Sequence, residues 1–295
     1  MDALHDLIFG SGVAIKQCQA VDHSNNFTLL IGRDSGDVDP AFTGVMEAEP
    51  TTTVTSLDVA GMVGIFGVAG ASVSAGTVTI PMTRRAAGST FAGTSSHFTM
   101  TGANAFGYPT TYSAQQGQDA TAAADIMFLS TNGLAAPLSS ATGATLSANA
   151  YNVAYTLGPA TIDGTEVPEI TGITVNPGLT VETRKYSGSV YPTVCVITQR
   201  NPTIELTVAD FDEIDTYGPM FVTNDSIDAV AYFRKCADGS TRVADATEEH
   251  IAFTLSDGIT TVESFSGQDT SDGSAVIRIT GKTLTVSATS AISTS

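Results

Sequence analysis

Several residue types on which common functions depend are scarce in this chain. Tryptophan is absent from its 295 residues, and lysine and arginine number only 12 against 30 aspartates and glutamates. A protein that grips nucleic acid neutralises phosphates with basic side chains, and a net charge of −18 leaves few for that role. The acidic excess suits either solubility or a surface that does not adhere to another polyanion.

Cysteines are few, and long hydrophobic runs are missing. Cys18, Cys195 and Cys236 are an odd and scattered set, which predicts reduced thiols rather than a disulfide framework. The longest apolar run, residues 61–73, is rich in glycine and shorter than the ~20 residues that span a bilayer. The first residues are acidic where a secretion signal is basic. We therefore expect neither secretion nor membrane insertion.

Motifs that carry chemistry are also missing. Gly281-Lys282-Thr283 ends like a phosphate-binding loop, but Val276 stands where that loop needs glycine. The sequence has no nucleophile-elbow or zinc-protease motif, and its four histidines do not cluster. His97 and His250 fall at matching places on strand faces that the alternation predicts to be polar. No catalytic residue, metal or cofactor is predicted, and we expect a protein that is not an enzyme.

What the chain does contain is an internal repeat. Residues 35–58, SGDVDPAFTGVMEAEPTTTVTSLD, align without a gap to residues 187–210, SGSVYPTVCVITQRNPTIELTVAD, and eight of 24 positions are identical. Average residue usage gives roughly one or two matches. Further matches keep their order with a drift of a few residues, which loops absorb. We predict one copy over about residues 10–133 and a second over about 158–281.

Within each copy, apolar and polar residues alternate with the period of a β-strand. Residues 203–208, TIELTV, are one example, and Ser35-Gly36 and Ser187-Gly188 are typical of hairpin turns. Pro81 lacks the amide that a sheet ladder needs, which predicts an edge strand or a bulge there. One short helix per copy is expected, over residues 57–66 and 209–217, capped by Ser56 or Asp58 and by Asp210.

These patterns predict a mostly β protein of two tandem domains, each a β-sandwich or half-barrel with one short helix. We expect the first domain over residues 1–146, with an N-terminal arm, and the second over residues 147–295. The Ser-, Ala-, Thr- and Gly-rich passage of residues 135–159 is predicted to connect them, part of it as strand.

The order of turns, prolines and strands in each copy resembles the major tail tube proteins of long-tailed phages. The resemblance covers most of the chain and rests on an SGxVxP turn, a ten-residue proline spacing, and a Pro-Thr step into an alternating strand and short helix. The residues that carry it are Ser35, Gly36, Val38, Pro40, Pro50 and Thr51, and Ser187, Gly188, Val190, Pro192, Pro202 and Thr203. In that family each domain is a β-sandwich with a helix, and both copies here fit this pattern.

The resemblance implies a structural protein of the virion tail, assembled in the host cytoplasm. Six domains form a ring in that family, so three two-domain chains would make a pseudo-sixfold ring, and stacked rings would make a hollow conduit for genome delivery. The implied partners are further copies of the chain and the tail terminator, tape measure and distal tail proteins. DNA would pass through without specific binding, and no membrane is involved.

Physical arguments then suggest which residues serve such a tube. Joining domains head to tail around an axis pairs open strand edges that would otherwise aggregate. A bore of like charge avoids phosphate contacts, so we expect acidic residues to line it, with five candidates: Asp37, Asp39, Glu47, Glu49 and Glu205. Contacts between rings are expected from the N-terminal arm and the loops between paired prolines, with eight candidates: Met1, Asp2, Leu4, Ile8, Phe42, Val45, Val194 and Ile197.

Three alternatives stay open at this point. A tail terminator or adaptor ring would share the architecture, and an adhesin or pilus-type repeat protein would be built from similar sandwiches. A carbohydrate-active hydrolase on a β scaffold would need perturbed carboxylates in one copy and not in the other.

Overall fold

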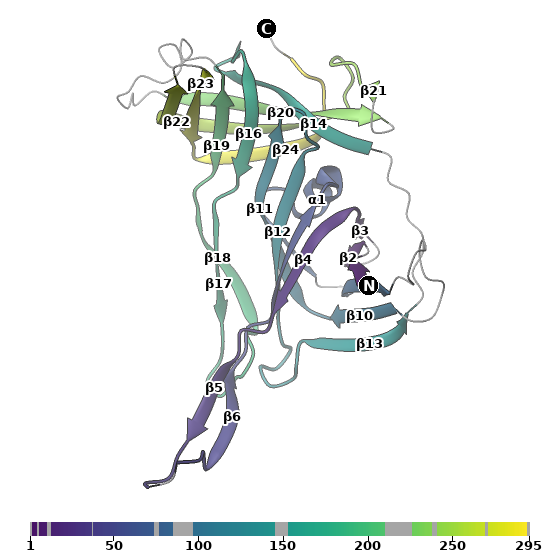
Figure 1. The fold of residues 1–295 in the computed structure, drawn as a ribbon, viewed down its shortest axis with the longest axis vertical. Helices are drawn as coiled ribbons and strands as arrows, with labels where there is room; N and C mark the ends of the chain where they lie inside the picture. The colour runs from purple at the N-terminus through teal and green to yellow at the C-terminus, as the bar shows by residue number, and fades with distance from the viewer. Residues whose placement is uncertain are drawn as a thin grey trace.

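The computed structural model describes residues 2–4, 6–10, 13–36, 38–73, 77–84, 97–144, 153–209, 226–237, 241–268 and 271–293. Over these residues the chain is almost wholly β-strand, with one short helix, so the predicted mostly β fold is confirmed (Figure 1). All three cysteines have free thiols, as predicted.

Among the described residues up to 144, the chain forms the helix α1 and thirteen strands. The helix is Val59–Phe66, and the strands are β1 (Asp2–Leu4), β2 (Leu7–Phe9), β3 (Val13–Ile15), β4 (Cys18–Ser24), β5 (Thr28–Gly32), β6 (Phe42–Glu47), β7 (Thr51–Ser56), β8 (Ala71–Val73), β9 (Val78–Arg84), β10 (His97–Gly102), β11 (Ala105–Gln115), β12 (Thr121–Phe128) and β13 (Leu138–Ala144). We call this part the first half. Its last strand lies in the passage predicted to be a connector.

The second half begins at β14. Its strands are β14 (Val153–Ile162), β15 (Thr165–Glu166), β16 (Ile170–Asn176), β17 (Leu179–Arg184), β18 (Val194–Arg200), β19 (Thr203–Val208), β20 (Ile227–Ala237), β21 (Thr241–Arg242), β22 (His250–Gln268), β23 (Ser271–Thr280) and β24 (Thr283–Ser290). The predicted domain boundary at residues 146 and 147 lies outside the described residues, between β13 and β14.

The strands of the two halves pair in the same way. In the first half Val21 of β4 lies opposite Val54 of β7, and in the second half Ile173 of β16 lies opposite Leu206 of β19. Both members of the second pair follow their counterparts by 152 positions (173 − 21 and 206 − 54). The two halves therefore share not only a strand order but a residue-by-residue register.

Even the irregularities of the sheets recur. The β11–β12 pair shifts register between Pro109 and Thr111, and the β22–β23 pair shifts between Val262 and Ser264, 153 positions later (262 − 109 and 264 − 111). The pairing of β10 with β13 matches that of β22 with β24, although β13 and β24 lie beyond the repeat that the sequence revealed. Pairing thus extends the similarity past the limits of detectable sequence identity.

Each half has two packed layers of strands. In the first half β13-β10-β9-β2-β3 form a six-stranded sheet with β1, and β11-β12-β7-β4 form the second layer. In the second half β22 is long enough to serve both layers: its first part pairs β20 and β24, and its last part pairs β23. Figure 1 shows the first of these layers running across the upper part of the molecule, where it crosses the upright strands β16 and β19.

The upright layers of the two halves join into a single sheet. Strand β11 of the first half pairs β16 of the second, with Ser113 opposite Thr174. The result is a continuous run of eight strands, β22-β23-β19-β16-β11-β12-β7-β4, which we call the wall. It consists of two equivalent four-strand blocks side by side.

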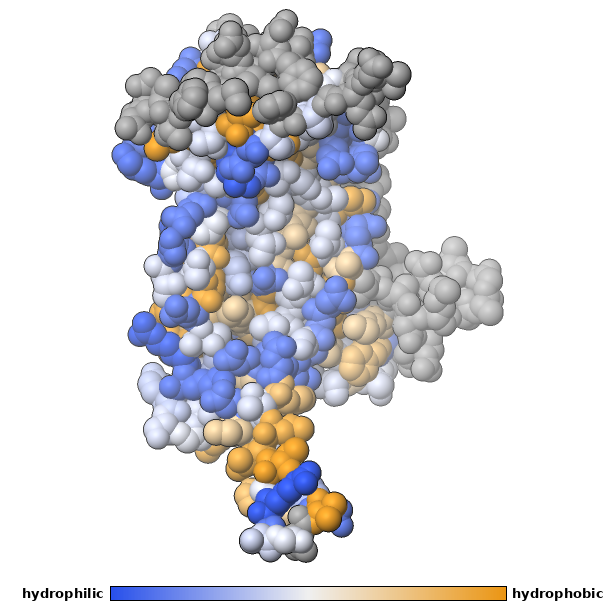
Figure 2. Space-filling view, turned by 60° about the vertical axis from the view of Figure 1, so that its left-hand side comes forward, coloured by the Kyte–Doolittle hydropathy of each residue, from blue (hydrophilic) through white to orange (hydrophobic). Residues whose placement is uncertain are grey.

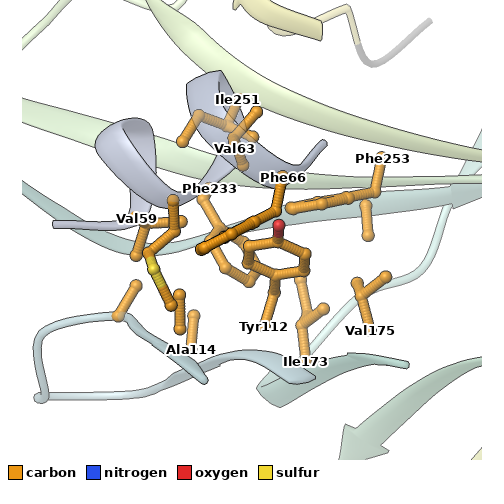
Figure 3. Close-up of a cluster of buried hydrophobic side chains, with 14 of the residues drawn as sticks. Val59, Val63, Phe66, Tyr112, Ala114, Ile173, Val175, Phe233, Ile251 and Phe253 are labelled. Atoms are coloured by element: carbon orange, nitrogen blue, oxygen red, sulfur yellow. The ribbon is translucent and has the colours of Figure 1, made fainter. Parts of the chain in front are cut away.

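A common hydrophobic core fastens the two halves together. Tyr112 of β11 is fully buried, and its ring lies 4.9 Å from the ring of Phe253 in the second half. The Tyr112 hydroxyl donates a 2.5 Å hydrogen bond to the Gly67 carbonyl at the end of α1. Figure 3 shows Tyr112 and Phe66 from the first half packed with Phe253 and Ile173 from the second. Separating the halves would expose this core to water.

The helix of the first half is confirmed where it was predicted. Asp58 caps it, accepting a 2.9 Å hydrogen bond from the Gly61 amide, and its other oxygen accepts one from the Lys16 amide at 3.0 Å. Asp58 thereby fixes both the start of α1 and the approach to β4. The helix expected over residues 209–217 falls almost entirely outside the described residues.

Two local predictions were wrong. Strand β9 is not an edge, because it pairs β10 on one side and both β1 and β2 on the other, and no bulge interrupts its register with β10 at Pro81. Pro81 lies where β9 changes partner, between Thr79, which pairs Ile8 of β2, and Met82, which pairs Leu4 of β1. Its missing amide therefore leaves no gap in either ladder. Both His97 and His250 are buried rather than on polar faces, since each begins a strand that a second layer covers.

We predict that Asp58→Ala lowers the free energy of unfolding by about 1–3 kcal/mol, because a helix cap and a second backbone partner are both lost. Denaturant unfolding of the dilute chain measures this change. Asp39→Ala, at an exposed turn position, is the matched control and should leave stability within about 0.5 kcal/mol of the parent. Equal stability of the two variants would contradict the assigned role of Asp58.

Candidate self-association surface

The wall has one buried face and one polar face, because alternate residues of a strand point to opposite sides. Val54 and Leu206 lie on the buried side, beneath the second layers of strands. Thr53, Asp125 and Glu205 lie on the other side, where they are partly or fully exposed. In the first half, β18 contacts part of this face, where the Cys195 Sγ donates to the Met127 Sδ at 3.3 Å.

Polar residues form a cross-strand row over this face. Paired residues on neighbouring strands make up the row, in the first half Asp22, Thr53, Asp125 and Tyr108, and in the second half Thr174, Glu205, Arg278 and Thr261. Corresponding members are 152 or 153 positions apart, as in the rest of the repeat. The row carries carboxylates in both halves and a single guanidinium in the second.

In the first half the carboxylate of Asp125 is held by neutral donors. Thr53 donates to it at 2.7 Å, and the Tyr108 hydroxyl donates at 3.4 Å. Burial, and then the neighbouring Asp125 charge, raise the pKa of Tyr108 to about 12. The phenol therefore stays protonated as a donor to Asp125 on the polar face.

In the second half the matching position is Arg278, which lies between two carboxylates. Its Nε donates to Glu205 at 2.8 Å, its Nη2 also donates to Glu205, and its Nη1 donates to Glu263 at 2.9 Å. Hydrogen bonding to Glu205 raises the pKa of the Arg278 guanidinium above its ordinary value. The group links three neighbouring strands, β19, β23 and β22.

The wall ends in an open edge at β4. Within the described residues β4 pairs only β7, whereas its counterpart β16 pairs β19 on one side and β11 on the other. At the far end of the wall, residues 265–268 of β22 pair β23 alone among the residues that the structure describes, whereas the counterpart stretch of β11 pairs both β12 and β16. Each end of the wall therefore presents the counterpart of one of the two strand edges that pair at the β11–β16 junction, but without its partner.

A pair of hairpins extends from the wall, one from each half. The β17–β18 hairpin packs on the first half: the Val190 amide donates to Gly133 at 2.8 Å, and the Ala48 amide donates to Val190 at 2.9 Å. Lys185 adds ion pairs of 3.0 Å with both Glu47 and Glu49. This hairpin lies along the molecule (Figure 1).

The β5–β6 hairpin projects instead, although it is the counterpart of β17–β18. Figure 2 shows it as an apolar projection below the body of the molecule. Large apolar side chains are exposed on it: Phe27, Leu29, Leu30, Ile31, Val38, Phe42, Val45 and Met46. An apolar surface of this kind on a monomer marks an interaction site.

The five predicted bore residues separate into different places. Glu205 lies on the polar face of the wall, Asp39 lies in the turn of the β5–β6 hairpin, and Asp37 is outside the described residues. Glu47 and Glu49 come together at Lys185, where they hold the β17–β18 hairpin. Their facing toward a channel stays a prediction.

The predicted ring-contact residues also divide. Phe42 and Val45 are exposed on the β5–β6 hairpin, and Val194 and Ile197 lie on β18. Met1 is outside the described residues. Asp2, Leu4 and Ile8 belong to β1 and β2, which are strands of the six-stranded sheet. The described residues 2–4 and 6–8 are thus built into that sheet rather than extending freely from it.

Sequence reasoning missed part of this surface. Asp22, Asp125, Arg278 and Glu263 were not chosen, because only strand register shows that they share a face. Leu29 was also missed, although the run Phe27-Thr28-Leu29-Leu30-Ile31 breaks the alternation expected of a half-buried strand and could have signalled a hairpin apolar on both sides.

No model of a known protein family matches the chain, and no curated protein has a significantly similar sequence. Over the described ranges, no group of three or more His, Cys, Asp or Glu side chains is placed to hold a metal ion. The same residues contain no helix of the length and apolarity that crossing a membrane requires.

We predict that Leu29→Ser with Val45→Ser reduces self-association at least tenfold while leaving the stability of the isolated chain nearly unchanged. These two residues pair across the β5–β6 hairpin and are 62% and 47% exposed, so the folded chain alone gains little from them. Sedimentation velocity measures association, and denaturant unfolding measures stability.

The equivalent pair in the second half is a matched control. Val181 and Ile197 pair across β17–β18, 152 positions later (181 − 29 and 197 − 45), and both are half-buried. Val181→Ser with Ile197→Ser should lower stability more than it lowers association. Equal effects of the two double variants would show that the exposed hairpin has no special part in assembly.

Proposed function

We propose that this protein is a tail tube subunit of a long-tailed phage, three chains of which form a pseudo-sixfold ring. The observation that carries the proposal is the β11–β16 junction, which joins two equivalent four-strand blocks inside one chain and leaves the same junction half-made at each end. A chain built in this way can satisfy both ends only with neighbours that repeat the arrangement.

The free-energy argument begins with the backbone. An edge strand presents unpaired amides and carbonyls, and proteins cover or pair such edges to prevent irregular aggregation. Each end of the wall fits the other end of a second copy, so the contact is head to tail. A head-to-tail contact closes into a ring when its rotation permits and otherwise continues as a filament. The rotation that relates neighbouring chains would be the same as the rotation that relates the two four-strand blocks at the β11–β16 junction.

The size of the closed ring supports a conduit. Three chains contribute eight wall strands each, which gives 24 strands. With strands about 4.8 Å apart and tilted by about 40°, the backbone diameter is on the order of 45 Å. Porins of about 16–18 strands already enclose a water-filled channel, so a barrel of this size stays open.

The polar face of the wall is the one that would line the channel. The second layers and α1 pack on the opposite face, and a closed barrel has more room for such layers outside than inside. The inner surface would then carry Asp22, Asp125 and Glu205 among threonines and serines. Such a surface offers phosphates few cationic partners, so DNA would pass without specific binding.

The projecting hairpin supports the stacking of rings. Its apolar residues lie on both faces of a two-stranded ribbon, and such a ribbon needs partners on more than one side. We assign Phe42 and Val45, with Leu29, to contacts between copies in neighbouring rings. Tail terminator, tape measure and distal tail proteins are the further partners in this proposal, and the virion tail is its place of action.

An engineered disulfide tests the junction between chains. Inside the chain Ser113 lies opposite Thr174, and the repeat offsets of 153 and 152 transfer that pair to Ser266 of one chain and Asp22 of the next. We predict that Asp22→Cys with Ser266→Cys forms intermolecular disulfides, because paired β residues have Cα separations that a disulfide can bridge. Non-reducing electrophoresis after mild oxidation should show a ladder that ends at three chains.

Two variants control this experiment. Ser113→Cys with Thr174→Cys should close within one chain, and His23→Cys with Ser266→Cys should not crosslink, because His23 points to the other side of β4. Burial raises the pKa of Cys18 and of Cys195 to about 11, so these native thiols react slowly at pH 8.

Electron microscopy of the purified protein completes the test. Hollow tubes and a three-chain ladder are the expected results. Rings that never stack would favour a terminator or adaptor ring instead. If the internal pair Ser113→Cys with Thr174→Cys oxidises while the intermolecular pair does not, and no ring is seen, the proposed assembly is wrong.

A further inference from the structure

Arg278 is the only lysine or arginine in the eight strands of the wall, within their described bounds. Its position would place a guanidinium on the surface proposed to line the channel. Arginine binds phosphate through two parallel hydrogen bonds and is well suited to that contact. An accessible arginine at this place would therefore work against free passage of a polyanion.

The two halves of the chain treat this position differently. The counterpart of Arg278 in the first half is Asp125, and the counterpart of Glu205 is Thr53. Asp125 alone contributes one negative charge. In the second half one positive charge on Arg278 and two negative charges on Glu205 and Glu263 also leave one negative charge. The exchange of an acid for an arginine is thus balanced locally.

Each of the three guanidinium nitrogens of Arg278 donates one hydrogen bond to a glutamate. Glu205 accepts from Nε and Nη2 on one side, and Glu263 accepts from Nη1 on the other. The Arg278 side chain is 39% exposed, so it can be reached from solvent. Without the two carboxylates, the same fork of N–H groups would be open to an anion.

We infer that Glu205 and Glu263 hold Arg278 in a charge-compensated cluster that prevents it from binding the phosphates of a polyanion in the channel. This inference rests on the proposed function, because it requires that the polar face of the wall line the bore. Within the cluster Arg278 ties β19, β23 and β22 together, and the two glutamates are the residues that keep the surface non-adhesive.

Charge-neutral variants of assembled tubes test the inference. Glu205→Gln with Glu263→Gln keeps the shape of both side chains and removes the two charges that compensate Arg278. In a three-chain ring this uncovers three arginines. We expect the assembled double variant to bind a short fluorescent DNA duplex at least tenfold more tightly than the parent at low salt. The gain should disappear as salt rises, because phosphate contacts release counterions.

Two further variants separate this effect from a general change of charge. The triple variant Glu205→Gln, Glu263→Gln and Arg278→Gln should return DNA affinity to near the parental level. Asp245→Asn releases Arg234, which Asp245 binds through two 2.9 Å contacts outside the wall. That variant should leave DNA affinity in the channel within about twofold of the parent if accessibility on the wall is what matters.

The outcomes distinguish the two proposals. If tubes form and the double variant binds DNA no more tightly than the parent, the charge-compensation inference is overturned while the tube assignment stands. If the parent protein forms neither rings nor tubes, the proposed function itself fails. Single variants Glu205→Gln and Glu263→Gln each leave Arg278 one carboxylate partner and should give intermediate affinities, so the ranking tests the inference even where the double variant assembles poorly.

Discussion

Backbone hydrogen bonding at the edges of the wall governs the rest of this structure. Strand β16 is paired on both sides because β11 of the other half lies beside it, and β4, its counterpart, is paired only by β7 within the described part of the chain. One chain therefore contains this strand edge twice, once paired at the β11–β16 junction and once unpaired at β4. The unpaired amides and carbonyls of an open edge favour a further strand, which is the physical basis of the proposed assembly with other copies.

The internal junction is stabilised by more than its ladder. Tyr112 at that junction is buried against Phe253, and its hydroxyl is satisfied by Gly67. A shared core of this kind makes the two halves one folding unit, although they repeat one pairing scheme. The two hairpins differ because only one of them has a neighbouring half to pack against. The β17–β18 hairpin packs on the first half, whereas the β5–β6 hairpin projects and exposes apolar residues.

Equivalent places on the polar face of the two halves also carry the same net charge. The first half carries Asp125 with neutral donors, and the second carries Arg278 between Glu205 and Glu263. Both arrangements leave one negative charge at equivalent places. Such a surface suits a channel in which a polyanion slides, because it provides neither free cations nor large apolar patches for adhesion.

Sequence alone determined the strand-rich class, the internal repeat, the hairpin turns at Gly36 and Gly188, and the capped helix at Asp58, because alternation, turn chemistry and capping are local properties. Alternation placed Glu205 on the polar face of its strand, as the structure confirms, but gave no signal for Arg278 or Asp22. Pro81 and the buried His97 were misjudged because their environment depends on which strands pair beside them. Only the tertiary structure decided the register of the wall, its shared core and its open edge, since these depend on pairings such as β11–β16 and β19–β23, which join residues more than 50 positions apart.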